Sequence, residues 1–212
     1  MTRVRTFALL AAVALAATVS LSAQQPPARP ASGVGTASAE VGGTWVKTDK
    51  TTTYQGGKWM DITYGRPHLR GRSSIFGSGA DYGKAILAGA PIWRAGANVA
   101  TRLKTDVAIM IGNTHIQPGE YTVYIDAKEN NWTFVLSSWA IQTTFDPKNK
   151  AALWGAYGYT ADKDVVRAPM TLSTLPSSVD QLTWSFVDIT DKGGKLAIMW
   201  DTTMAVVPFT LM

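Results

Sequence analysis

The chain contains 212 residues, among them 20 basic and 15 acidic side chains, and it has no cysteine. The absence of cysteine excludes disulfide bonds and thiolate chemistry. The formal net charge of +5 falls to +3 when the two arginines of the first 23 residues, Arg3 and Arg5, are left out. So small an excess, spread along the chain, makes no basic surface, and this excludes nucleic acid as a partner.

The first residues have the pattern of a signal peptide. Arg3 and Arg5 precede an apolar stretch over residues 7–19, and small residues follow in "SLSAQQ". We therefore predict a signal peptide over residues 1–23, cleaved after Ala23, and an exported protein that is periplasmic or extracellular. The apolar stretch is shorter than the roughly 20 residues that span a bilayer, so no stable membrane span is expected after cleavage. An uncleaved N-terminal anchor is the alternative.

The next segment has a different composition. Residues 24–40, "QQPPARPASGVGTASAE", are rich in Pro, Ala, Ser and Gly and poor in large apolar side chains. This composition predicts a flexible linker. Residues 41–212 are then expected to form a single β domain, which is large enough to bury a core without disulfide bonds.

Alternation of apolar and polar residues predicts strands that are joined by hairpins. The segments "EYTVYID" and "WTFVL" alternate in this way on either side of a turn, "KENN". The segments "LTWSFVDI" and "LAIMW" flank "TDKGGK", where Gly193 and Gly194 supply the positive φ of a tight turn. Pro118 and Gly119 mark a further turn between strands.

These strands predict an all-β fold, a sandwich or jelly-roll-like arrangement of mainly antiparallel hairpins. Only residues 82–90 and the region 149–155 favour helix, so at most one or two short helices are expected. Pro208, within "MAVVPFTLM", predicts that the last strand lies at the edge of a sheet, because proline cannot donate a ladder hydrogen bond.

The residue patterns of metal and nucleophilic sites are missing from the sequence. His68 and His115 stand far apart, and neither has a histidine two or four positions away. "ADKDVV" lacks the glycine and glutamate of a calcium loop, and "FGSGA" is not a nucleophile elbow. We therefore assign no catalytic residue, no metal ligand and no cofactor. Acids near predicted strands leave a pair of carboxylates open, although outward-facing surface acids are the commoner explanation; they are Asp61, Glu120, Asp126, Asp188 and Asp201.

Some of the eight tryptophans are candidates for sugar stacking. Trp184 and Trp200 lie in step with aliphatic residues and are expected in the core. Trp45 and Trp59 have polar neighbours, and Trp139 and Trp154 follow loops, so these four could present exposed rings to a carbohydrate. Inward packing is the more frequent state of such rings.

The most distinctive polar strings are "YGRPHLRGR" at residues 64–72 and "WRAGAN" at residues 93–98. A guanidinium presents a planar fork of donors that suits a carboxylate or phosphate, and it stacks on aromatic rings. We expect a pocket bounded by Arg66, Trp93, Arg94 and Asn98. The competing interpretation is structural, with both arginines bonded to Asp61, Asp81 or main-chain carbonyls.

These strings carry a family resemblance. "ITYGRPHLRGRSSIFGSGADYGK", "IWRAGANVATRL", "IQPGEYTVYI" and "WGAYGYTADKDVVR" resemble the exported bacterial family catalogued as domain of unknown function 2911. The resemblance covers roughly residues 59–207 and implies a secreted, mostly β domain, with no reaction attached. Three features depart from the family pattern: Val99 stands where members often carry an acid, "AILAGAPI" looks like an insertion, and His68 replaces a small hydroxyl residue.

We expect a non-catalytic binding domain, with a small anionic or polyhydroxylated molecule or a carbohydrate as its ligand. Arg66 and Arg94 would supply charge-assisted hydrogen bonds, Trp93 a stacking wall, and Asn98 orienting donors and acceptors. One alternative is a hydrolase acting on a saccharide or envelope component, which requires carboxylates that converge in a cleft. The other is a purely structural or interaction domain, which predicts an exposed apolar patch or an open sheet edge instead of a pocket. The sequence specifies no oligomeric state.

Overall fold

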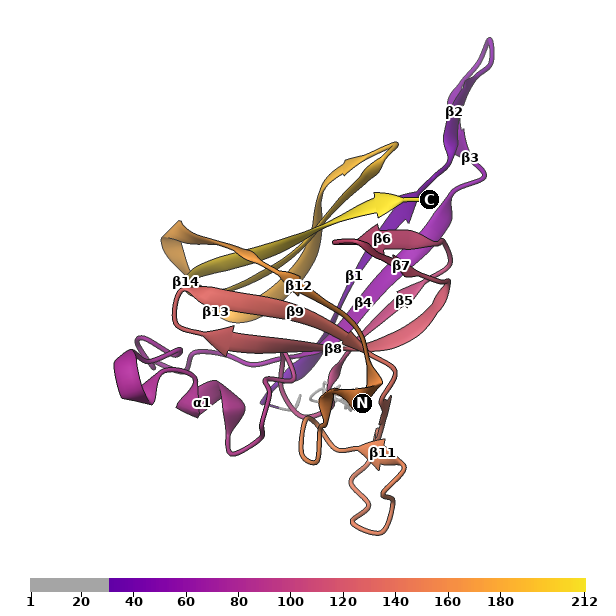
Figure 1. The fold of residues 1–212 in the computed structure, drawn as a ribbon. Helices are drawn as coiled ribbons and strands as arrows, with labels where there is room; N and C mark the ends of the chain where they lie inside the picture. Colours follow the sequence, from indigo (N-terminus) through magenta and orange to yellow (C-terminus); the bar gives the residue numbers. More distant parts are fainter. Residues whose placement is uncertain (1–30) are drawn as a thin grey trace, which may run out of the picture.

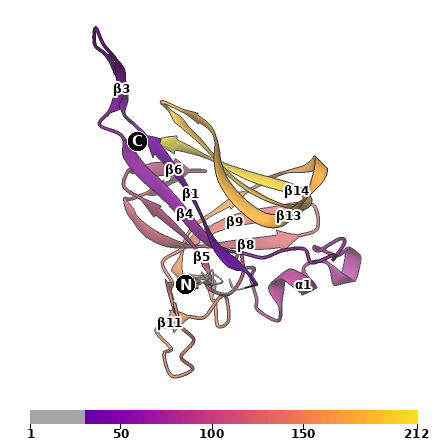
Figure 2. The same cartoon turned by 180° about the vertical axis from the view of Figure 1, so that it is seen from behind.

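The computed structural model describes residues 31–212. The predicted signal peptide and the first part of the predicted linker lie outside this range. Two antiparallel sheets pack against each other (Figures 1 and 2). The predicted all-β sandwich is therefore confirmed.

The larger sheet contains six strands in the order β1-β4-β5-β8-β9-β12. Their bounds are β1 Gly33–Val41, β4 Lys58–Arg66, β5 Thr101–Thr105, β8 Gly119–Lys128, β9 Asn131–Ser137 and β12 Asp164–Pro169. The smaller sheet has the order β13-β14-β6-β7. Its strands are β13 Thr171–Thr190, β14 Gly193–Leu211, β6 Ile109–Ile111 and β7 Thr114–Ile116.

The predicted hairpins are confirmed. Strands β8 and β9 pair in register from Thr122 opposite Ser137 to Lys128 opposite Asn131. Strands β13 and β14 pair across a turn at Asp191 and Lys192. The turn therefore lies just before the two glycines predicted to form it: Gly193, the first residue of β14, has a φ of 148°, and Gly194 has no positive φ. A side chain at Gly193 would come within 2.2 Å of the Phe209 carbonyl oxygen, so only glycine fits this close approach.

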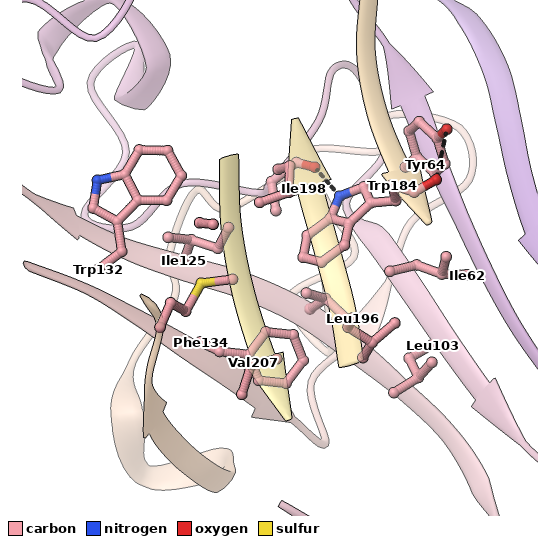
Figure 3. Close-up of a cluster of buried hydrophobic side chains, with 14 of the residues drawn as sticks. Ile62, Tyr64, Leu103, Ile125, Trp132, Phe134, Trp184, Leu196, Ile198 and Val207 are labelled. Atoms are coloured by element: carbon pink, nitrogen blue, oxygen red, sulfur yellow. Dashed lines mark hydrogen bonds between the residues drawn. The ribbon is translucent and has the colours of Figure 1, made fainter. Parts of the chain in front are cut away.

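The core lies between the two sheets and is rich in aromatic rings. Trp93, Trp132 and Phe76 meet edge to face, and Trp200 stacks on Trp93 with centroids 6.3 Å apart. The indole of Trp184 packs beside Leu196 and Ile198, as Figure 3 shows. Trp184 and Trp200 are buried, as the alternation predicts. Rings of this size dominate the apolar area removed from water.

Three segments lie outside the two sheets (Figure 1). The hairpin β2–β3, Thr44–Lys47 and Thr52–Gln55, extends away from the body of the domain. The helix α1, Lys84–Leu87, falls inside the region where a short helix is predicted. The connection from β9 to β12 holds the parallel pair β10, Ala140–Ile141, and β11, Ala152–Leu153, so the helix predicted for 149–155 is wrong.

The linker predicted over residues 24–40 is wrong for its last part, because Gly33–Val41 forms β1 and pairs with β4 along its whole length. The strand escapes recognition because its inward residues are small. Ala37 and Ala39 face the core, and Gly35 lies under the ring of Tyr64, where a Cβ would be 2.7 Å from the ring. Burial still alternates along the strand.

The prediction that the last strand lies at an edge is also wrong, since β14 lies between β13 and β6. Its pairing with β13 ends at Val206, and its pairing with β6 begins at Phe209. Pro208 therefore occupies the junction between two ladders, where its missing N–H costs no ladder hydrogen bond.

Candidate ligand-binding site

The structure separates the four residues expected to bound a pocket. Trp93 is 1% exposed and packs among the core aromatics, whereas Arg94 points the other way. The backbone of Trp93 exchanges two hydrogen bonds with Ile125, so this segment runs like a short strand beside β8. Consecutive side chains of an extended segment face opposite sides. Trp93 and Arg94 therefore do not line one pocket, and the ligand-binding role of the set stays a prediction.

Arg94 connects two loops. Its Nη1 donates to the Asn98 carbonyl oxygen at 3.1 Å, and its guanidinium lies 5.9 Å from the ring centroid of Tyr157. The side chain also fits against Gly155, where a Cβ would come within 2.5 Å of Nη1. These contacts match the structural interpretation, in which the arginine ties loops to the sandwich.

Arg66 ends β4 and reaches the smaller sheet. Its Nη2 donates to Thr183 Oγ1 at 3.2 Å, across the gap between the sheets. Its Nε is buried and has no hydrogen-bond partner among the residues that the structure describes. Arg66 and Arg94 thus contact different elements, and the two arginines share no cavity in the part of the chain described.

The glycines of the two distinctive strings allow the two backbones to pack closely against each other. A Cβ on Gly65 would lie 1.8 Å from the Ala97 carbonyl oxygen, and the Ala97 N–H donates to the Gly65 carbonyl at 3.2 Å. The Ala95 carbonyl accepts from Trp184 Nε1 at 2.9 Å and from Thr101 Oγ1 at 3.0 Å. The two strings therefore interlock backbone to backbone, and only glycine allows this approach.

Asn98, the last residue of the interlocked loop, borders a cavity on the outer face of the larger sheet. This outer cavity has a volume of about 630 Å³. Its floor and walls come from β1, β4, β5 and β8, from the loop before β5, and from β10 and the residues that follow it. They include Val34, Thr36, Asp61, Thr63, Asn98, Val99, Arg102, Lys104, Glu120, Ile141 and Thr143.

Strand register places charges of both signs in a row across the outer cavity. Lys104 on β5 lies opposite Asp61 on β4 and also opposite Glu120 on β8. Ser38 Oγ donates to Asp61 Oδ1 at 2.5 Å. Because neighbouring strands lie about 4.8 Å apart, the backbones that carry the two carboxylates are roughly 10 Å apart.

Arg102 is held rigidly on the floor of the cavity. Its Nε donates to Glu120 Oε1 at 3.0 Å and its Nη1 to Thr122 Oγ1 at 2.6 Å. The Arg102 side chain is 19% exposed, whereas that of its partner Glu120 is 56% exposed. Lys104 is also exposed, and its Nζ lies 3.6 Å from Asp106 Oδ1. The cavity is therefore lined by charged groups, of which Arg102 is the most firmly held, with Val34, Val99 and Ile141 as its apolar side.

The connection from β9 to β12 covers the neighbouring part of the same outer face. Tyr124, Val135 and Leu153 form a second, small core there. Burial raises the pKa of the Tyr124 hydroxyl well above its ordinary value, although nearby Arg102 opposes the change. Burial likewise raises the pKa of Tyr159, helped by the hydrogen bond that its hydroxyl donates to Asp164 at 2.6 Å. Both phenols therefore stay neutral donors at physiological pH.

Asp164 belongs to a network of hydrogen bonds at the end of the connection between β9 and β12. Arg167 donates to Asp164 and to Asp126 at 2.9 and 2.8 Å, which fixes β12 against β8. Desolvation lowers the pKa of Arg167, but the hydrogen bond to Asp164 and the negative charges of Asp164 and Asp126 outweigh it and raise the pKa. No group of three metal-ligating side chains occurs in residues 31–212. No helix in that range is long and apolar enough to cross a bilayer.

Sequence reasoning missed Arg102 and Lys104 as site residues. Both alternate with buried Leu103 in "TRLKT", just as Asp61 and Thr63 alternate with Met60 and Ile62. That alternation marks an outward face, but only strand order shows that these faces adjoin.

The four tryptophans that could present exposed rings differ in their exposure. Trp45 is 68% exposed and Trp59 is 48% exposed, whereas Trp139 and Trp154 are half-buried.

The fold and this cavity define a β-sandwich domain with a hollow on the outer face of its larger sheet, lined by both charged and apolar side chains. The chain belongs to the family described as "Protein of unknown function (DUF2911)", whose sequence model matches residues 47–209. The resemblance found in the distinctive strings is thereby confirmed. No curated protein and no solved structure matches the chain.

Proposed function

We propose that this protein is an exported, non-catalytic binding domain that holds a small polyhydroxylated ligand in the outer cavity. The observation that carries the proposal is the row of Asp61, Lys104 and Glu120 along the cavity, beside threonine hydroxyls. Such a row offers both donors and acceptors within reach of one molecule. A volume of about 630 Å³ is in the range of small-molecule sites.

The balance of charge favours hydroxyl groups over a simple anion as the ligand chemistry. Two carboxylates and two cations line the outer cavity, so their charges cancel. Arg102, the cation that suits an anion best, is already engaged by Glu120 and Thr122. A neutral molecule with several hydroxyls can bond to both signs without leaving a charge unpaired.

The test is isothermal titration calorimetry of the mature protein against glucose, N-acetylglucosamine, glucuronate, inositol, phosphate and acetate. We expect at least one of the sugars or the polyol to bind, and Lys104→Met and Asp61→Asn each to weaken that binding about tenfold, because each removes one charged hydrogen-bonding group. Lys128→Met is the matched control, since Lys128 is an exposed lysine at the far end of β8. If none of the sugars or inositol binds at millimolar concentration, or only the simple anions do, the proposal fails.

One observation supports a hydrolase as a second candidate. Asp61 and Glu120 line the same cavity on either side of Lys104. Glycosidases that invert configuration use two carboxyl groups about 6.5–9.5 Å apart, with room for a water molecule between. Turnover of nitrophenyl glycosides that disappears in both Asp61→Asn and Glu120→Gln would establish this activity. Binding without turnover leaves the non-catalytic function.

A further inference from the structure

A second cavity lies in the connection between β9 and β12. It has a volume of about 660 Å³ and is lined by the rings of Trp139, Phe145, Trp154 and Tyr157. We refer to it as the aromatic cavity. The segment 139–143 separates it from the outer cavity, because Trp139 and Gln142 line one hollow while Ile141 and Thr143 line the other. The two hollows are therefore distinct sites with different linings.

Two rings of the aromatic cavity remain in water. Phe145 is 60% exposed and Tyr157 is 45% exposed, although a buried phenylalanine would stabilise the fold by about 1.5–3 kcal/mol. Phe145 contacts Trp154 with centroids 6.0 Å apart and planes tilted by 58°. Phe145 and Tyr157 thus leave part of an apolar wall open to water.

A lysine and hydrogen bonds hold the rings of Trp139 and Tyr157 in place. Lys163 Nζ lies 3.8 Å from the ring centroid of Trp139, whose Nε1 donates to the Thr160 carbonyl at 3.0 Å. The Tyr157 hydroxyl donates to the Ala88 carbonyl at 2.9 Å. A ring fixed at its edge or from one face loses little further freedom when a ligand packs on it, which favours binding.

The loop that carries Phe145 is held in shape by one buried side chain. Gln142 Nε2 donates to the carbonyls of Asn149 and Ala152, both at 2.9 Å, and its Oε1 accepts from the Asp146 N–H at 2.7 Å. The amide therefore closes the loop from three directions. Phe145 stands on a formed turn, so its exposure belongs to a defined wall.

The geometry points to a second binding site, in which the aromatic cavity takes one sugar residue of a glycan. A sugar ring has an apolar C–H face that packs on an aromatic ring and a rim of hydroxyls that needs polar partners. Asp146, Asn149 and Lys150 line the same cavity and offer a carboxylate, an amide and an ammonium group. This inference does not rest on the outer cavity.

The test is retention of the mature protein on insoluble cellulose, chitin and peptidoglycan, followed by calorimetry with a soluble oligosaccharide of the polymer that retains it. We expect at least one polymer to retain the wild type, and Phe145→Ala to weaken binding about tenfold, or about 1.4 kcal/mol, since it removes one ring on which the sugar packs. Trp45→Ala is the matched control: it removes a ring of similar exposure from the hairpin β2–β3, away from both cavities. Thermal melting of each variant shows that it is folded.

The outcomes separate the two sites. The inference is overturned if no polymer retains the wild type, if Phe145→Ala binds as the wild type does, or if Trp45→Ala loses binding equally. Loss of retention in Lys104→Met but not in Phe145→Ala would place the glycan in the outer cavity. That result would overturn this inference and leave the proposed function standing.

Discussion

Replacement of Gly65 by alanine tests the interlock of the two distinctive strings. A Cβ at this position would lie 1.8 Å from the Ala97 carbonyl oxygen, and real Cβ atoms do not approach closer than 3.0 Å. The loop of residues 93–98 must therefore retreat by about 1.2 Å. The atom in the way is backbone, so no side-chain rotation relieves the contact.

The cost of this retreat has two parts. Overpacking of a well-filled site costs about 1–3 kcal/mol. The Ala97 N–H to Gly65 carbonyl hydrogen bond, and with it the bonds that Ala95 accepts from Trp184 and Thr101, are strained or lost at about 1 kcal/mol each. We expect a destabilisation of about 2–5 kcal/mol, which lowers the melting temperature of a domain of this size by about 5–15 °C.

Differential scanning calorimetry measures the effect, with Gly33→Ala as the control. Gly33 lies on β1, and a Cβ there meets no atom within 4 Å. Its substitution should change the melting temperature by no more than about 2 °C, within the range usual for surface substitutions. Equal melting temperatures of the two variants would refute the argument that a close backbone contact at Gly65 holds the two strings together.

Two further predictions concern side chains around the interlock. Arg94→Ala removes the bond to the Asn98 carbonyl and the contact with Tyr157, and should lower stability by about 1–2 kcal/mol in urea denaturation while ligand binding in the outer cavity stays within threefold. An unchanged stability with binding lost would instead place Arg94 on the ligand. Because the pKa values of Tyr124 and Tyr159 are raised by folding, the unfolded chain loses these protons first, so stability should be constant below pH 10 and fall above it. Denaturation at pH 9, 10 and 11 should show a shallower fall in Tyr124→Phe, and identical slopes in the variant and the wild type would contradict this.

Much of the fold follows from alternation in the sequence. The hairpins β8–β9 and β13–β14 have large apolar residues on one face and clear turn residues between the strands, so their local signals agree with the final structure. Strand β1 lacks such a signal because Ala37 and Ala39 supply too little apolar area to be distinguished from a linker. Pro208 leads to the wrong prediction of an edge strand, because the sequence near it does not show that β14 changes its pairing partner from β13 to β6 at this point.

The candidate site is harder to predict from the sequence than the fold, because the set of residues that line it depends on the order of the strands. Trp93 and Arg94 look like one constellation in the sequence, yet the alternation of an extended segment sends them to opposite sides. Asp61, Lys104 and Glu120 are far apart in the sequence and meet only because β4, β5 and β8 are neighbours. Register, which a single sequence does not specify, therefore determines which charges share a cavity.

The two distinctive strings meet through their backbones, and the end of the second string borders the outer cavity. Gly65, Gly96 and Ala97 bring two backbones together, so changes there act on stability. Asn98 and Val99, the next residues along the chain, line the outer cavity. Val99 is apolar, and a carboxylate at this position would add a negative charge to a cavity that Lys104 and Arg102 also line. The interlock thus fixes the loop, and the residues that follow it along the chain border the outer cavity.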